Sequence, residues 1–196
     1  MLLQLIFLTY ILSQAVVVLD SSNTLFLRGA INNELSNNII KKIHSIEDDT
    51  IVLYIKSPGG SVQAGNRIVQ VMDAMTANGK DIVCIAEEAY SMAFIIFQAC
   101  ATRYVMSSSV LMQHQMALMT VGQIERIRSQ MKMYESVERE LNQRQADRLQ
   151  MSLKEFEANV SNDWWMYGSD IMKNKAADRV IHAMCSNNFR KCPLYF

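Results

Sequence analysis

Residues 50–61 read TIVLYIKSPGGS, and this stretch decides the fold. The continuous β-branched run at 51–55 is typical of a strand that is covered on both faces. Ser-Pro-Gly-Gly then turns the chain, and residues 62–75 carry apolar side chains at helical spacing until Gly79 ends the pattern. A buried strand that turns through bare glycines into a helix is the unit of an α/β protein with a parallel sheet.

Similar units lie on both sides of this stretch, because runs of strand character alternate with runs of helical spacing. The strands are expected at 23–31 (NTLFLRGAI, with a turn), 81–86 (DIVCIA), 103–106 (RYVM), 110–115 (VLMQHQ) and 175–181 (KAADRVI). The helices are expected at 32–46 (NNELSNNIIKKIHSI), 89–101 (AYSMAFIIFQACA), 123–151 and from 152 onward. In such sheets the chemistry gathers at the carboxyl ends of the strands. Gly59, Gly60 and the start of AYSMAF should therefore lie on one rim.

Composition narrows the class of protein. The chain has 196 residues, which suits one domain with one core. A net charge of +0 argues against a nucleic-acid partner. The chain has no CxxC spacing, its three histidines are far apart, and Cys84 and Cys100 resemble small core residues, so no metal site is expected. No cofactor motif is recognised, and the absence of GxxxxGK[ST] excludes ATP hydrolysis by a P-loop.

The first residues differ from the rest, because no charged side chain precedes Asp20. The apolar stretch is short for a membrane span, and Ser13 and Ala15 suit a signal-peptide cleavage after Ala15. We therefore expect residues 1–15 to be a signal peptide, with an uncleaved anchor or a buried first element as alternatives. A signal would make the protein secreted or membrane-associated; otherwise it is cytoplasmic or organellar. The loop from Cys185 to Cys192 is short enough to close as a disulfide.

Three side chains at predicted element ends attract attention. Ser91 lies where a buried strand meets an apolar helix, His114 follows a strand-like run, and Asp163 precedes two tryptophans. Taken singly, Ser91 and Asp163 read as caps and His114 as a hydrogen-bonded structural residue. Taken together, these residue types permit a nucleophile, a general base and an orienting carboxylate. Sequence spacing alone does not show that the three side chains converge in the fold.

Four motifs in order, LYIKSPGGSVQAG, YSMAF, VLMQHQ and NDWWM, resemble those of the proteolytic subunits of the Clp protease family. The resemblance covers residues 24–181. It implies a ClpP/crotonase-type α/β fold with repeated β-β-α units, a mainly parallel sheet and a helical handle. Residues 16–196 would then form a single ClpP-like peptidase domain.

The resemblance also implies a serine endopeptidase that cuts peptides or unfolded proteins. Ser91 would be the nucleophile, His114 the base and Asp163 the orienting carboxylate, with the backbone N–H groups of Gly60 and Met92 as the oxyanion hole. The resemblance implies that Gly59, Gly60 and Gln115 bind substrate. A side chain at position 60 would crowd the peptide being cut. The expected partners are further copies in a homo-oligomeric ring and, least securely, an AAA+ unfoldase.

Some residues depart from the family pattern. Ala93 replaces the usual glycine, Met116 stands where proline normally follows His-Gln, and the helix-to-strand segment near Ala101 is about two residues short. Two alternatives therefore stay open. One is a catalytically inactive ClpP-like ring subunit, and the other is a crotonase-type acyl-CoA enzyme, against which the Ser, His and Asp set argues.

Overall fold

The computed structural model describes residues 15–190, 192 and 194. In this part of the chain, the strands are β1 (Val16–Leu19), β2 (Thr24–Arg28), β3 (Thr50–Ser57), β4 (Asp81–Tyr90), β5 (Thr102–Gln113), β6 (Trp164–Tyr167), β7 (Arg179–Val180) and β8 (His182–Cys185). The helices are α2 (Asn33–Ser45), α3 (Val62–Ala77), α4 (Met92–Ala99), α5 (Ile124–Leu149), α6 (Leu153–Val160) and α7 (Ser169–Lys173). Residues 1–14 of the expected signal peptide lie outside the described residues.

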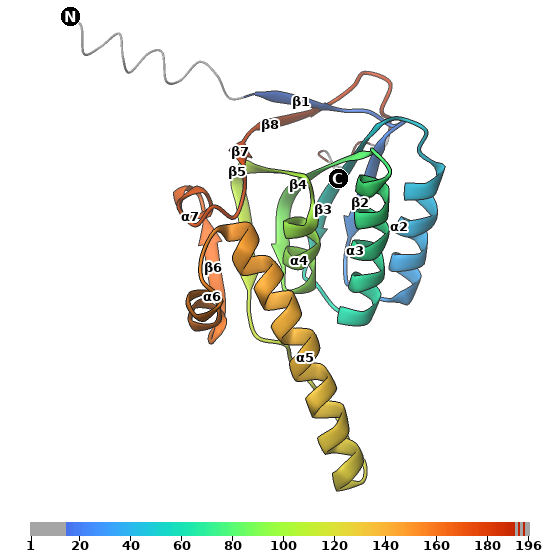
Figure 1. Cartoon of the computed structure of the whole chain (residues 1–196). Helices are drawn as coiled ribbons and strands as arrows, with labels where there is room; N and C mark the ends of the chain where they lie inside the picture. The colour runs from blue at the N-terminus through green and yellow to red at the C-terminus, as the bar shows by residue number, and fades with distance from the viewer. Residues whose placement is uncertain (1–14, 191, 193, 195–196) are drawn as a thin grey trace, which may run out of the picture.

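The main sheet has the strand order β2-β3-β4-β5-β6, with β7 paired to β5 (Figure 1). Strands β2 to β5 are parallel to their neighbours, and so is β7 to β5, whereas β6 is antiparallel to β5. The prediction of a mixed α/β fold with a mainly parallel sheet is confirmed. The prediction of two short strands at 103–106 and 110–115 was wrong, because residues 102–113 form the single strand β5 and residues 114 and 115 lie beyond its end.

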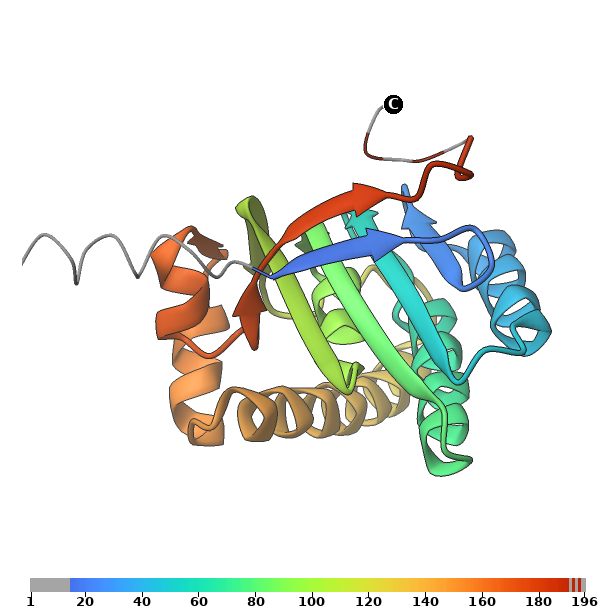
Figure 2. The ribbon, with the colours of Figure 1, turned by 90° about the horizontal axis from the view of Figure 1, so that it is seen from above.

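Both faces of the sheet are covered, which explains the continuous apolar run of β3. Ile51, Leu53 and Ile55 belong to the larger core on the face of helices α2 to α4. Val52 and Tyr54 point to the other face, into a smaller core that includes Leu19 and Cys185. Figure 2 shows the source of that second cover: the parallel pair β1 and β8 lies across the sheet.

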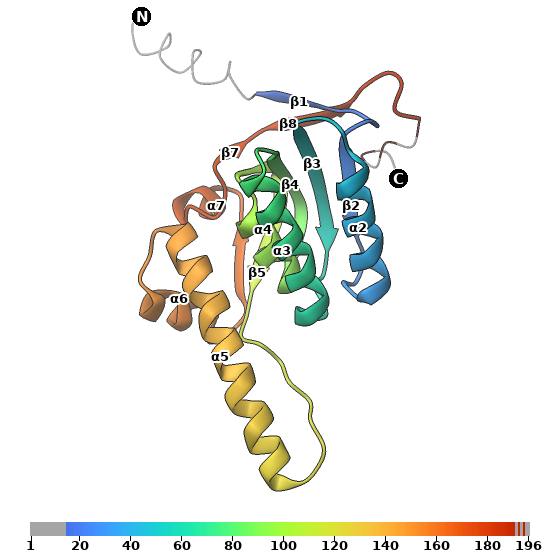
Figure 3. The same cartoon turned by 45° about the vertical axis from the view of Figure 1, so that its right-hand side comes forward.

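Helix α5 extends well beyond the body of the fold, and the segment between β5 and α5 runs beside it to its far end (Figure 3). Its buried residues, Gln145, Ala146 and Leu149, are all near its carboxyl end. This arrangement corresponds to the helical handle that the family resemblance implies. Among the described residues, no helix is long and apolar enough to cross a membrane.

Two disulfides, Cys84–Cys100 and Cys185–Cys192, account for all four cysteines. Cys84 and Cys100 are buried in the core, as expected of small core residues, but they are also bonded to each other. Sequence analysis missed this pair because the two residues lie in separate elements, β4 and the end of α4.

Candidate active site

Ser91 is the single residue between β4 and α4, and its backbone is unusual. Its φ of 54° and ψ of −122° lie in a region that residues with a side chain rarely adopt, at a cost of about 1–3 kcal/mol. The Ser91 N–H donates to the carbonyl of Met112 on β5 (2.9 Å), which fixes the turn to the neighbouring strand. The side chain makes no capping hydrogen bond. Ser91 therefore occupies the N-cap position of α4, but its hydroxyl does not cap the helix.

The Ser-Pro-Gly-Gly turn packs directly against this serine. Gly59 has a φ of +88°, and a Cβ added to it would lie 2.5 Å from the Tyr90 carbonyl oxygen and 2.8 Å from the Cβ of Ser91. Such distances are far below contact, so any side chain at position 59 would displace the Ser91 turn. Ser57 stabilises this turn, because its hydroxyl donates to the Gly29 carbonyl (2.7 Å) and accepts from the Gly59 N–H (3.2 Å).

Gly60 has a different constraint. Its φ is +144°, and an added Cβ would lie 2.4 Å from the carbonyl oxygen of Ile31, to which Gly60 is bridged. The sequence argument explained this glycine by the approach of a peptide, and the structure adds a nearer obstacle within the protein. The hydroxyl of the next residue, Ser61, caps α3 by accepting from the Ala64 N–H (3.3 Å). The bare turn is thus required by packing, whatever approaches it from outside.

Two backbone donors remain beside Ser91. Within the described part of the chain, the N–H groups of Gly60 and Met92 donate to no protein acceptor. Met92 is the first residue of α4, where N–H groups have no partner within the helix and where the positive end of the helix dipole lies. A developing negative charge near Ser91 would be stabilised by such donors.

A small hollow brings Ser91 and His114 together, although they are distant in sequence. It lies where the β4–α4 turn, the end of β5 and the middle of α5 meet. Its lining consists of Val62, Ser91, Met92, Ile95, Gln113, His114, Gln115, Met116, Glu138, Leu141 and Asn142. Three residues predicted from the sequence, Ser91, His114 and Gln115, therefore line one hollow together with Met92.

Asp163 is not part of that lining. It is exposed and lies one residue before β6, whose Trp164 pairs with Gln113 of β5. The ladder ends at this pair, and His114 and Asp163 are the next residues beyond it on the two chains. Among the described residues no hydrogen bond joins His114 to Ser91 or to Asp163. The topology thus brings the three residues near one another, but their side chains are not linked.

Sequence reasoning missed Glu138 and Gln145, two residues of α5 that contact the His114 segment. The Met116 N–H donates to Glu138 Oε1 (2.8 Å). The side-chain amide of Gln113 accepts from the His114 N–H (3.1 Å) and donates to Gln145 Oε1. A glutamine or glutamate on a long charged helix carries no local signal of such a contact, since the contact depends on how α5 packs on β5.

The Cys84–Cys100 disulfide encloses the serine turn. Cys84 is in β4 and Cys100 is the C-cap of α4, with a separation of 16 residues and Cα atoms 5.9 Å apart. Ser91 lies near the middle of the closed loop. The covalent bond therefore holds the strand before the serine to the end of the helix after it.

The charged residue Glu87 lies at a bulge in β4, shortly before the Ser91 turn. Register shifts on both sides of the strand leave Glu87 out of the ladder, and its carboxylate accepts from the Tyr54 hydroxyl (2.7 Å) and from Lys56. Burial works to raise the pKa of Glu87, but these hydrogen bonds outweigh it and lower the pKa overall. Burial, followed by the bond to Glu87, raises the pKa of Tyr54. Glu87 is thus an ionised structural partner.

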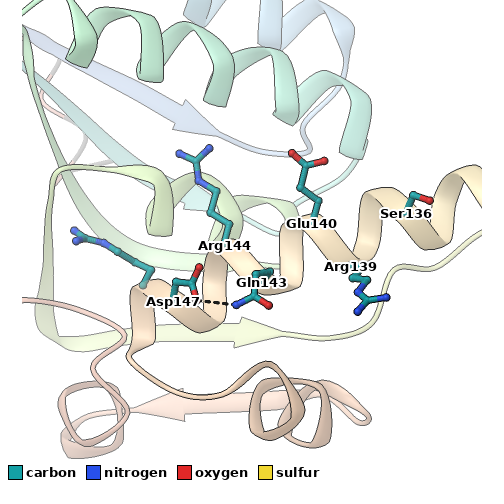
Figure 4. A pocket seen from close by; sticks show the side chains of 7 residues that line it. Ser136, Arg139, Glu140, Gln143, Arg144 and Asp147 are labelled. Atoms are coloured by element: carbon teal, nitrogen blue, oxygen red, sulfur yellow. Dashed lines mark hydrogen bonds between the residues drawn. The ribbon is translucent and has the colours of Figure 1, made fainter.

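A second, more open hollow lies along α5 and is shown in Figure 4. It is lined by α5 residues alone, including Ser136, Arg139, Glu140 and Gln143. Arg144 is engaged elsewhere, in a two-bond ion pair with Asp73 of α3 (2.6 and 2.7 Å). This hollow contains no histidine, so the hollow at Ser91 is the better candidate for an active site.

Comparison with known families agrees with the geometry. The family model described as Clp protease matches residues 11–184 of the chain. This match spans most of the chain and includes the serine turn, the end of β5 and the residues before β6. The chain therefore belongs to the Clp protease family.

Proposed function

We propose that the protein is a serine endopeptidase that hydrolyses peptide bonds in peptides or unfolded proteins. Membership of the Clp protease family supports a peptidase in general. The observation that carries the finer proposal is the hollow shared by Ser91, Met92 and His114. The N–H groups of Gly60 and Met92, which donate to no acceptor among the described residues, support it. The serine hydroxyl is not used for capping, so it remains available for chemistry.

In the proposed mechanism, Ser91 Oγ attacks the carbonyl carbon of the scissile bond while His114 takes the hydroxyl proton. The carbonyl oxygen becomes an oxyanion that accepts from the N–H groups of Gly60 and Met92. Loss of one such donor typically costs on the order of 3 kcal/mol of transition-state stabilisation. His114 then protonates the leaving amine, and water hydrolyses the acyl-serine. Asp163 orients the imidazole, which requires the two side chains to form a hydrogen bond that is absent among the described residues of the single chain.

Further copies of this chain would form a ring around the sites. The Clp protease family typically forms oligomeric rings and works with unfoldases. We propose a homo-oligomeric ring for this protein, with an AAA+ unfoldase as a candidate partner. Sedimentation or native mass spectrometry of the full chain tests the ring directly.

Labelling with a serine-reactive fluorophosphonate tests the proposed chemistry. The full chain should be labelled at Ser91, and Ser91→Ala should lose both labelling and peptide turnover, the latter by at least about a thousandfold. His114→Ala should slow labelling without removing the serine. A folded, assembled chain that is not labelled, or unchanged turnover in Ser91→Ala, would refute the proposal.

A catalytically inactive ring subunit is the second candidate. The observation that favours it is the lack of any hydrogen bond among Ser91, His114 and Asp163 in the described residues, with Asp163 exposed. Intact rings that neither cleave peptides nor react with the fluorophosphonate would establish this alternative.

A further inference from the structure

The segment that carries His114 leaves β5 at Gln113 and is contacted by α5 on both sides of the histidine. Before it, the Gln113 side chain links the His114 N–H to Gln145. After it, the Met116 N–H donates to Glu138 Oε1 (2.8 Å). The position of the candidate base thus depends on α5 as well as on the sheet.

The two α5 residues lie on one face of the helix. Positions 138 and 145 are two turns apart, and Leu141 between them lines the hollow at Ser91. The Gln145 amide also donates back to the Leu141 carbonyl (3.0 Å), so its orientation is set by the helix itself. Gln113 and Gln145 are 3% and 1% exposed, whereas Glu138 is only partly buried.

Glu138 differs from Gln145 in three respects. It carries a charge, it lines the hollow together with Ser91 and His114, and its partner is a backbone N–H group. A carboxylate that accepts from an N–H forms a charge-assisted bond, which is stronger and geometrically more defined than a neutral one. The bond requires a residue at position 116 that has an N–H, which proline lacks and Met116 supplies.

We propose that Glu138 is a positioning residue for the peptidase reaction. By holding the Met116 N–H, its carboxylate sets where the segment after β5 runs, and hence where the His114 imidazole lies relative to Ser91 Oγ. The inference rests on the proposed function, because it assigns a role in that same site. Glu138 and Met116 act together, because replacing Glu138 by alanine or Met116 by proline removes the same hydrogen bond.

The test compares five variants of the full chain: Glu138→Ala, Glu138→Gln, Met116→Pro, the double variant of Glu138→Ala with Met116→Pro and, as control, Glu140→Ala. Glu140 is an exposed glutamate of the same helix. Glu138→Ala should lower kcat and the rate of fluorophosphonate labelling by about 10- to 100-fold, since small displacements of a reacting group have effects of that size. KM should change by less than about threefold, because the lost contact positions the base rather than the substrate.

Glutamine can still accept from the Met116 N–H, so Glu138→Gln should restore most of the rate, and Glu140→Ala should behave as wild type. Adding Glu138→Ala to Met116→Pro should lower the rate no further, because the contact is already absent. Equal losses in Glu138→Ala and Glu138→Gln, or a wild-type kcat in Glu138→Ala, would overturn the inference. His114→Ala separates the two proposals: if it loses activity while Glu138→Ala does not, the peptidase assignment stands and the role of Glu138 falls.

Hydrogen–deuterium exchange provides a readout that needs no activity. Peptides covering residues 113–118 should exchange faster in Glu138→Ala than in wild type and Glu140→Ala, with unfolding midpoints unchanged. Unaltered exchange there would overturn the positioning role even if the protein proves to be an inactive subunit.

Discussion

A methyl group added at Gly59 should disturb the serine turn, and Gly79 offers a matched control. Both glycines have a φ of +88°, but an added Cβ meets nothing within 4 Å at Gly79, whereas at Gly59 it lies 2.5 Å from the Tyr90 carbonyl oxygen. Alanine at either site would have the same unfavourable φ. The difference between the two variants therefore isolates the close approach of the Ser-Pro-Gly-Gly turn to Ser91.

The expected magnitudes follow from these two terms. A positive φ costs a residue with a Cβ about 1–2 kcal/mol, so Gly79→Ala should lower the free energy of unfolding by that amount. Gly59→Ala adds an overpacking term of about 1–3 kcal/mol, because the atoms it meets are backbone and the Cβ of Ser91 and cannot rotate away. We therefore expect Gly59→Ala to be less stable than Gly79→Ala by about 1–3 kcal/mol.

Urea unfolding of both variants, followed by circular dichroism, measures this difference. Fluorophosphonate labelling under native conditions then reports on the serine: Gly59→Ala should react more slowly than wild type, and Gly79→Ala at the wild-type rate. Equal destabilisation in the two variants, or normal labelling of a destabilised Gly59→Ala, would show that the Ser-Pro-Gly-Gly turn and the Ser91 turn do not approach each other as described.

Two further predictions concern the disulfide around the serine and an ion pair. Replacing Cys84 and Cys100 by alanine should lower the free energy of unfolding by about 3 kcal/mol, the chain-entropy value for a loop of this length. Guanidinium unfolding without reductant measures this loss, and a loss below about 1 kcal/mol would contradict the prediction. Burial works to raise the pKa of Asp178, but hydrogen bonds from Arg103 outweigh it and lower the pKa in the folded state. This stabilisation is present above the unfolded pKa of about 3.9 and is lost as the pH falls through the lower folded pKa. Asp178→Asn should therefore destabilise the protein at pH 7 and weaken the dependence of its unfolding free energy on acidic pH, as measured by urea unfolding. An unchanged dependence at acidic pH would contradict this.

Many of the strands, helices and turns could be predicted because they depend on local sequence patterns. The run before Ser-Pro-Gly-Gly is apolar on both faces of β3, and Gly79 follows the C-cap of α3, as the pattern indicated. Ser91 was correctly expected between a buried strand and an apolar helix. These features depend on residues within a few positions of one another, where spacing and turn chemistry carry the information.

Features that depend on distant contacts could not be predicted in the same way. Nothing near Cys84 indicates that it meets Cys100, because the pairing depends on how α4 folds back on β4. The role of Glu138 depends on α5 lying against the end of β5. The placement of Asp163 at the same end of the β5–β6 ladder as His114 depends on β6 turning back antiparallel, which residues 164–167 do not indicate on their own.

The pairing of β1 with β8 has a mechanical consequence. The strands are parallel, with Val16 beside His182 and Leu19 beside Cys185, and the flanking bonds run from the His182 N–H to the Ala15 carbonyl and from the Ser186 N–H to the Leu19 carbonyl. A pull on the chain before residue 16 and after residue 185 would draw the two strands in opposite directions along their length. All the bonds of the ribbon would then bear the load together instead of opening one at a time. Extraction of this protein by its ends should accordingly meet its first resistance at this ribbon, before the sheet beneath it is loaded.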